Sequence, residues 1–132
     1  ATDSTDRSTT SISYVDVTGS SVTITPQKST SSVLLIWSFW AGISAAAAAH
    51  RGRFQITDSS NNAISGAQDQ YFGDASGTTF LQANQTLFAY STPATTSAVT
   101  YKGRFCTTNG TSAVNIAGNL STTQMYAIEV SA

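Results

Sequence analysis

The run VLLIWSFW at residues 33–40 decides how this sequence folds. Successive side chains of an extended chain point to opposite faces. Both faces of this run are then apolar, one with Val33, Leu35, Trp37 and Phe39 and the other with Leu34, Ile36 and Trp40. Such a strand must be covered twice, once by the opposite sheet and once by something else, such as a neighbouring subunit. We therefore expect oligomerisation, with Trp37 or Trp40 at a subunit contact.

Similar runs recur along the chain, rich in Val, Ile, Thr, Tyr and Phe and separated by clusters of Gly, Asn, Asp and Ser. They lie at residues 12–17, 22–26, 33–44, 50–57, 79–82, 86–90, 98–107, 113–117 and 124–130. Helix signals are almost absent. About nine short strands predict one all-β domain, an antiparallel sandwich or barrel over residues 11–132, preceded by a polar arm at residues 1–10.

The five consecutive alanines Ala45–Ala49 are the exception, because alanine favours helix. Five residues are too few to hold a helix in water, and strong strand signals flank them, so extended structure is favoured over a helical turn. Extended alanines would let two backbones or subunits approach closely, although a spacer beneath a bulky aromatic is the alternative. The expected interface residues are thus Trp37, Phe39, Trp40, Ala47 and Ala49.

Composition excludes several classes of protein. The 132 residues have a net charge of -1, and their six basic residues form no long run, so nucleic acid is not an expected partner. The most apolar stretch, residues 33–49, is interrupted and too short to cross a membrane. The single Cys106 allows no intramolecular disulfide, so stability has to come from packing or assembly. The first ten residues show neither the basic nor the apolar region of a secretory signal, so we expect an intact chain made in the cytosol, with a processed or engineered start as the alternative.

Residues for catalysis are scarce. The chain has one His, His50, and one Cys, and it contains no nucleophile elbow, P-loop or zinc-binding helix motif. His50 is expected at a rim or interface. Asp58, Asp69 and Asp74 have no calcium-loop spacing, and aspartate is a common turn former. We therefore expect no enzyme activity, no cofactor and no metal.

Two surface features remain as candidate contacts. HRGRF and YKGRF each place two basic side chains on one face of a strand, and neighbouring strands would join them into a basic patch; a solvated face is the alternative. That patch would hold Arg51, Arg53, Lys102 and Arg104. The longest irregular stretch, residues 58–77, is expected to form a pair of turns around a short strand, and it is the best candidate for a variable surface loop. Its Tyr71 and Phe72 are possible platforms for a sugar, as are Trp37 and Trp40, although packing is favoured for all four.

The order of these segments resembles a known family. YVDVTGSSVTITPQKSTSSVLLIWSFW is followed by RGRF, a Gly/Asp loop, STPATTSAVTYKGRF and a closing TTQMYAIEV. This pattern, over Ser11 to Val130, resembles tailed-bacteriophage virion proteins related to the trimeric jelly rolls of the tumour-necrosis-factor and complement type. Its most specific piece is Ser91 to Tyr101 with Pro93, and its second is the closing strand with Met125, Ile128, Glu129 and Val130.

The resemblance implies a non-enzymatic homotrimer in the virion, made in the host cytoplasm. A head-decoration (cement) protein that binds the major capsid protein is the first expectation, and a receptor-binding fibre tip that holds a bacterial surface glycan is the alternative. Under the first, the contacts with capsid come from Thr2, Asp3, Asp6, Arg7, Arg51 and Arg53. Under the second, the receptor loop presents Asp69, Tyr71, Phe72 and Asp74.

Overall fold

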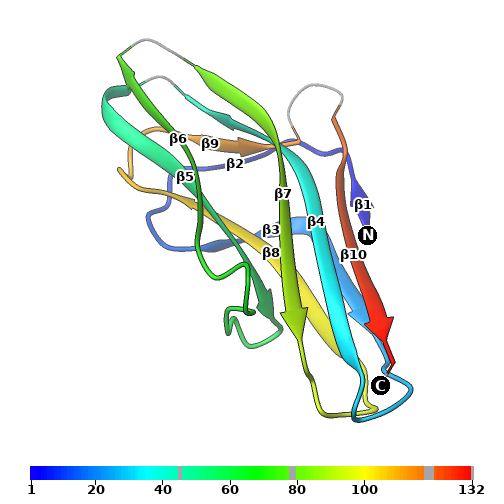
Figure 1. The fold of residues 1–132 in the computed structure, drawn as a ribbon. Coiled ribbons are helices and arrows are strands. Elements are labelled where there is room, and N and C mark those ends of the chain that lie inside the picture. The colour runs from blue at the N-terminus through cyan, green and yellow to red at the C-terminus, as the bar shows by residue number, and fades with distance from the viewer. Residues whose placement is uncertain (45, 78–79, 118–120, 132) are drawn as a thin grey trace.

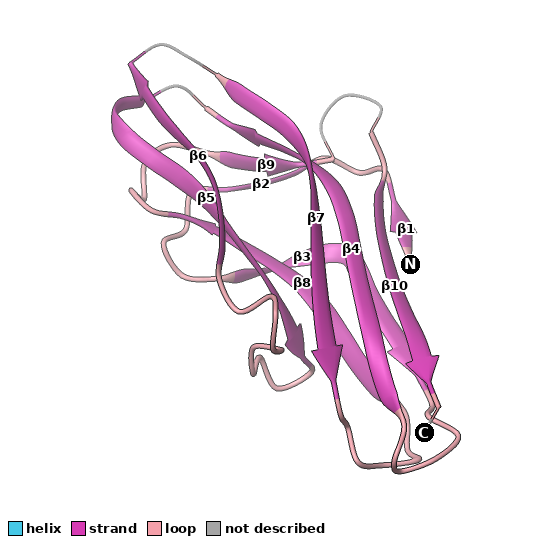
Figure 2. Cartoon of the chain, viewed as in Figure 1, coloured by secondary structure: helices cyan, strands magenta, loops and turns pink. Residues whose placement is uncertain are grey.

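The computed structural model describes residues 1–44, 46–77, 80–117 and 121–131, and it describes side chains throughout these ranges except at 46–49 and 74–77. Strands and loops make up all of this part of the chain, and no helix occurs in it (Figure 2). The strands are β1 (Thr2–Asp3), β2 (Arg7–Thr9), β3 (Val15–Ile24), β4 (Ser32–Ile43), β5 (Ala46–Asp58), β6 (Gln70–Gly77), β7 (Leu81–Ser91), β8 (Val99–Thr107), β9 (Val114–Ile116) and β10 (Thr123–Val130).

Two antiparallel sheets pack face to face (Figure 1). In the six-stranded sheet, here sheet A, β7 pairs along one edge of β4, while β10 and then β9 pair along its other edge. β1 and β2 flank β10 and β9. The four-stranded sheet, sheet B, has the order β3-β8-β5-β6. Every connection from β2 to β9, except the one between β5 and β6, passes from one sheet to the other. This arrangement confirms the predicted single-domain antiparallel jelly-roll sandwich.

The core lies between the sheets and is centred on Trp37. Its ring centroid lies 4.1 Å from that of Phe39, which in turn lies 4.9 Å from that of Phe54 in sheet B. The indole Nε1 of Trp37 donates a 2.9 Å hydrogen bond to the hydroxyl of Thr123, so its polar atom is satisfied inside the core. Gly103 makes room for the indole, because a Cβ there would lie 2.6 Å from Trp37.

Residues 1–10, expected as a polar arm that orders against a partner, already pair with their own subunit. Thr2 and Asp3 lie opposite Gln124 and Thr123 of β10, and residues 7–9 pair with β9. The amino group of Ala1 donates a 2.7 Å hydrogen bond to the carbonyl oxygen of Met125. Short polar strands such as these carry no hydrophobic alternation, so the sequence pattern gives no sign of their pairing.

Two other segments bear on the sequence predictions. β5 begins at Ala46, so the alanine run is extended over residues 46–49, as predicted, while Ala45 lies outside the described residues. The expected loop 58–77 holds a turn at Asp58–Asn62 and then the eight-residue strand β6. The strand is longer than the short one expected, because glycine and aspartate, which are rare in strands, interrupt its sequence pattern.

Candidate binding face

The outer face of sheet A carries a continuous group of apolar side chains, here the apolar patch. In β4, Leu34 lies between Tyr90 of β7 and Ile128 of β10. In the next row, Ile36 lies between Phe88 and Tyr126. With Val130, which lies opposite Ser32, the patch consists of Leu34, Ile36, Phe88, Tyr90, Tyr126, Ile128 and Val130.

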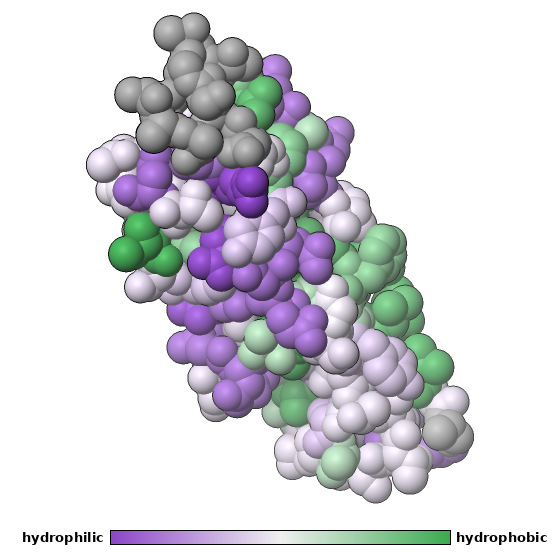
Figure 3. Space-filling model, turned by 60° about the vertical axis from the view of Figure 1, so that its left-hand side comes forward, coloured by the Kyte–Doolittle hydropathy of each residue, from purple (hydrophilic) through white to green (hydrophobic). Residues whose placement is uncertain are grey.

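These side chains are exposed to an unusual degree. Phe88 is 57% exposed, Tyr90 52%, Ile128 47% and Tyr126 46%. Hydrophobic residues gather along one long edge of the molecule in Figure 3, whereas hydrophilic residues dominate the rest of the face in view. Scattered exposed apolar residues are ordinary, but a contiguous group over three strands marks an interaction surface.

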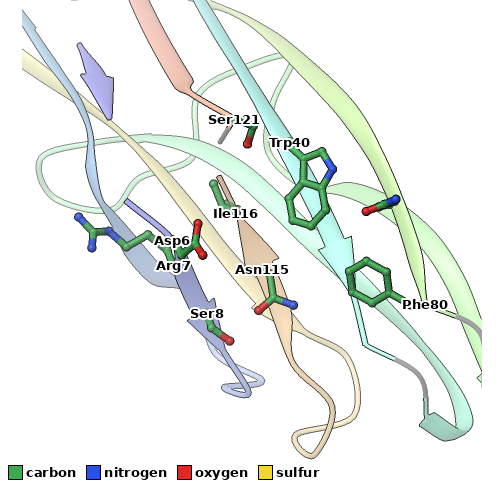
Figure 4. Close-up of a pocket in the computed structure, with 9 residues that line it drawn as sticks. Asp6, Arg7, Ser8, Trp40, Phe80, Asn115, Ile116 and Ser121 are labelled. Atoms are coloured by element: carbon green, nitrogen blue, oxygen red, sulfur yellow. The ribbon is translucent and has the colours of Figure 1, made fainter. Parts of the chain in front are cut away.

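Polar side chains bound the patch toward the far end of the sheet. The next row holds Gln124, Ser38 and Thr86, and the Thr86 hydroxyl donates to the Ser38 hydroxyl at 3.3 Å. Beyond it, Trp40 and Phe80 lie over the sheet in a hollow of about 430 Å³ (Figure 4). The hollow is lined by Asp6, Arg7, Ser8, Trp40, Phe80, Gln82, Asn115, Ile116 and Ser121.

The outer face of sheet B is built differently, because its charges pair with one another. Arg53 donates to both carboxylate oxygens of Asp69, at 3.0 and 2.6 Å, and the Tyr14 hydroxyl donates to the same carboxylate at 2.5 Å. The bond from Arg53 is the main cause that lowers the pKa of Asp69. Burial, followed by the Asp69 carboxylate, raises the pKa of Tyr14. Arg53, an expected capsid contact, and Asp69, an expected receptor residue, thus bind each other.

A second ion cluster joins β3 to β8. Asp16 accepts from Lys102 at 2.8 Å and from Arg104 at 2.7 Å, and these bonds outweigh desolvation in lowering its pKa. β5 and β8 are neighbours, as the basic-patch interpretation required. Arg53 nevertheless pairs with Asp69, and Lys102 and Arg104 share Asp16. These ion pairs within the subunit fit the alternative interpretation, a solvated face, better than a basic patch that awaits a partner.

The expected subunit contacts of Trp37 and Phe39 are corrected by the structure. These side chains are 0% and 2% exposed within a single chain, so they have no surface to offer a second subunit. The alternation along β4 was predicted correctly, but the face with Trp37 is the inner one. Trp40 is half-buried on the outer face, in the hollow. The side chains of Ala47, Ala49 and Asp74 lie outside the described residues.

The expected capsid contacts in residues 1–10 make contacts within their own subunit. Arg7 donates to Asp3 at 3.0 Å and to the carbonyl oxygen of Thr18 at 3.0 Å, so its guanidinium is held within the subunit. Asp6 lies at the edge of the hollow, and Thr2 is exposed on β1. Asp6 and Arg7 both line the hollow, and Arg7 also holds Asp3, while no observation tests contact with a capsid.

The expected receptor residues lie on β6 and next to it rather than in a loop. Tyr71 is 53% exposed, and its ring lies beneath Arg53 and Arg51, with centroid distances of 5.3 and 5.8 Å. Phe72 is half-buried and packs against the core. Arg51 is exposed on β5. The aromatic pair therefore points to opposite sides of the sheet.

The single His and the single Cys are both buried. His50, expected at a rim or interface, is 1% exposed, and neither ring nitrogen has a hydrogen-bond partner in the described structure. Cys106 is buried, and desolvation raises its pKa. Within the described ranges, no three His, Cys, Asp or Glu side chains gather in a way that would hold a metal. No helix suited to crossing a membrane is found there either.

Sequence reasoning missed the apolar residues of β7 and β10. The signal was present, because the outward-facing Phe88 and Tyr90 alternate with the inward-facing Leu87 and Ala89, as in β4. The sequence analysis recognised two apolar faces only in the run at residues 33–40, which contains both tryptophans. Comparison with known proteins adds no relative: no protein-family model and no curated protein matches this chain.

Proposed function

We propose that this chain is a non-enzymatic structural subunit that assembles with copies of itself through the apolar patch. The observation that carries the proposal is the patch itself, seven apolar side chains on adjacent strands β7, β4 and β10. Moving such a surface out of water contributes roughly 25 cal/mol for each Å² buried, which is the main favourable term in most protein association.

The chemistry of the patch suits a second copy as the partner. None of its seven residues is charged, so two copies brought together meet no repulsion and desolvate no ion. The net charge of the whole chain is only -1, which adds little repulsion at longer range. The two tyrosines at the patch present a hydroxyl that can stay at a hydrated rim. A homotrimer is the assembly that the resemblance to trimeric jelly rolls favours.

The larger role that we propose is that of a virion protein, and specifically a head-decoration protein that binds the major capsid protein. The support is the resemblance of the sequence to phage virion proteins together with the jelly-roll fold. A protein that binds only the assembled shell stabilises it by its binding free energy, repeated over many copies. A receptor-binding tip is the alternative role for the same trimer.

Sedimentation of a matched pair of variants tests the assembly. Ile128→Asp places a charge in the apolar patch, whereas Ile12→Asp makes the same change at a side chain that is 64% exposed and outside the patch. We expect the first variant to sediment as a monomer and the second to keep the wild-type assembly. Equal behaviour of the two variants would remove the patch from the proposal.

The location in the virion requires a separate experiment. Gold-labelled antibody against the chain, imaged on intact virions by electron microscopy, is expected to mark the whole head. Label confined to tail or fibre ends would replace decoration by the receptor-binding role, and unlabelled virions would contradict both.

A further inference from the structure

We propose that the hollow around Trp40 and Phe80 is a binding site for an uncharged saccharide, a pyranose that stacks on the two rings. This inference does not rest on the proposed assembly, since the hollow is separated from the apolar patch by the polar row Gln124, Ser38 and Thr86. Its volume of about 430 Å³ falls within the range of small-molecule sites, roughly 300–1,000 Å³.

The two aromatic rings form the floor of the site. Their centroids lie 6.2 Å apart with 34° between the ring planes, so they present neighbouring faces rather than stacking on each other. The absence of a side chain at Gly42 permits this arrangement. A Cβ at Gly42 would lie 2.6 Å from the Trp40 ring and 2.7 Å from the Phe80 ring.

Polar side chains flank the floor on both sides. The strand register places Ser8, Asn115 and Gln82 in one row across the sheet with Gly42, on β2, β9 and β7. Figure 4 shows Asn115, Ser8 and Asp6 opposite the two rings. Amides both donate and accept hydrogen bonds, and the carboxylate accepts them. Aromatic faces with amides and a carboxylate at the edge match a sugar ring, which has an apolar C–H face and hydroxyls around its rim.

Other classes of ligand fit the hollow less well. A purely apolar occupant would strip water from Asp6, Asn115 and Gln82 without replacing its hydrogen bonds. A phosphate or nucleic acid would meet the Asp6 carboxylate. The one basic residue of the lining, Arg7, is bonded to Asp3 and Thr18, and Figure 4 shows its guanidinium turned away from the hollow. These contacts favour a ligand without charge.

Tryptophan fluorescence provides a direct test on the wild-type protein. The chain has two tryptophans, and Trp37 is fully buried, so quenching by acrylamide reports on Trp40. Methyl glycosides of glucose, galactose, mannose, rhamnose and N-acetylglucosamine are titrated at millimolar concentrations. We expect at least one of them to protect Trp40 in a saturable manner. The proposal would be overturned if none of these sugars protected Trp40. It would also be overturned if protection depended only on protein concentration, since another copy of the chain would then cover the hollow.

Variants then locate the site, with binding read by saturation-transfer NMR on the protecting sugar. Phe80→Ala removes one ring, and Gly42→Ala displaces both, so each is expected to weaken binding by about tenfold. Tyr71→Ala removes an exposed aromatic on sheet B, outside both the hollow and the apolar patch, and it should leave sugar binding unchanged. Binding that survives both Phe80→Ala and Gly42→Ala, or that Tyr71→Ala abolishes, would place the sugar elsewhere and contradict the assignment.

Discussion

The outer faces of the two sheets differ in the side chains that they expose to water. On sheet B, Asp69 and Asp16 hold Arg53, Lys102 and Arg104, so its charges find partners within the subunit. On sheet A, side chains of the apolar patch stay exposed, with Phe88 57% and Tyr90 52% exposed. Ion pairs can be satisfied side by side on one surface, whereas apolar side chains are removed from water only by a layer above them. This contrast is the reason for proposing sheet A as the face that binds a partner.

Both faces depend on the core between them, so the largest effect on stability is expected there. Gly103→Ala would place a Cβ 2.6 Å from the buried ring of Trp37, and overpacking of this kind costs about 2–3 kcal/mol in the free energy of unfolding. Urea denaturation measures the loss. Trp37→Phe removes part of the opposing ring, so the double variant should be less destabilised than the sum of the two single variants. Additive losses would show that the contact is not the cause.

The two faces should differ in how stability depends on protein concentration. Self-association of the folded chain stabilises it by mass action, so the midpoint of thermal unfolding should rise with wild-type concentration. Ile128→Asp, on sheet A, should abolish that rise. Asp69→Asn, on sheet B, should keep it. Differential scanning calorimetry over a concentration series distinguishes these outcomes, and a wild-type midpoint independent of concentration would count against assembly.

The Asp69 cluster should contribute to stability without affecting assembly. Asp69→Asn removes the two-pronged ion pair with Arg53 and weakens the bond from Tyr14, at an expected cost of about 1 kcal/mol in the free energy of unfolding. Asp6→Asn is the matched control, because the Asp6 carboxylate has no ion pair in the part of the chain that the structure describes. Chemical denaturation at neutral pH should separate the two variants, and equal stability would show that the cluster is energetically neutral.

Acid should diminish the same contribution. The pKa of Asp69 is lowered from its ordinary value of 3.8, so the folded state binds this proton less readily than the unfolded chain does. The stabilisation is complete above 3.8 and is lost as the pH falls through the lower pKa of the folded state. The difference in unfolding free energy between wild type and Asp69→Asn should therefore shrink on acidification. A difference that stays constant or grows below this pH would contradict the ion-pair account.

Periodicity in the sequence predicted much of the fold. The strand at residues 33–44 and the closing strand were located nearly to the residue, because long apolar runs bounded by turn residues have few other structures open to them. Alternation also predicted correctly that Trp37 and Trp40 lie on opposite faces of the strand. It could not tell which of the two faces is the inner one, since both are apolar and the choice depends on how sheet B packs.

The remaining features depend on pairing between distant segments. The hollow brings together β2, β9, β4 and β7, and the Arg53–Asp69 pair joins β5 to residues just before β6. No local pattern encodes such juxtapositions, because strand neighbours are set by the topology of the whole sandwich. His50 was misplaced for a related reason, since a lone polar residue in a strand gives no sign of its burial.

Side-chain footprinting with hydroxyl radicals, carried out at high and low protein concentration, tests the difference between the two faces most directly. The account predicts that Phe88, Tyr90 and Tyr126 are protected at high concentration, where copies associate, and react at low concentration. Tyr71, which is equally exposed on sheet B, should react at both. Unchanged reactivity of the three patch residues, or protection of Tyr71 in their place, would contradict the claim that sheet A is the face that binds a second copy.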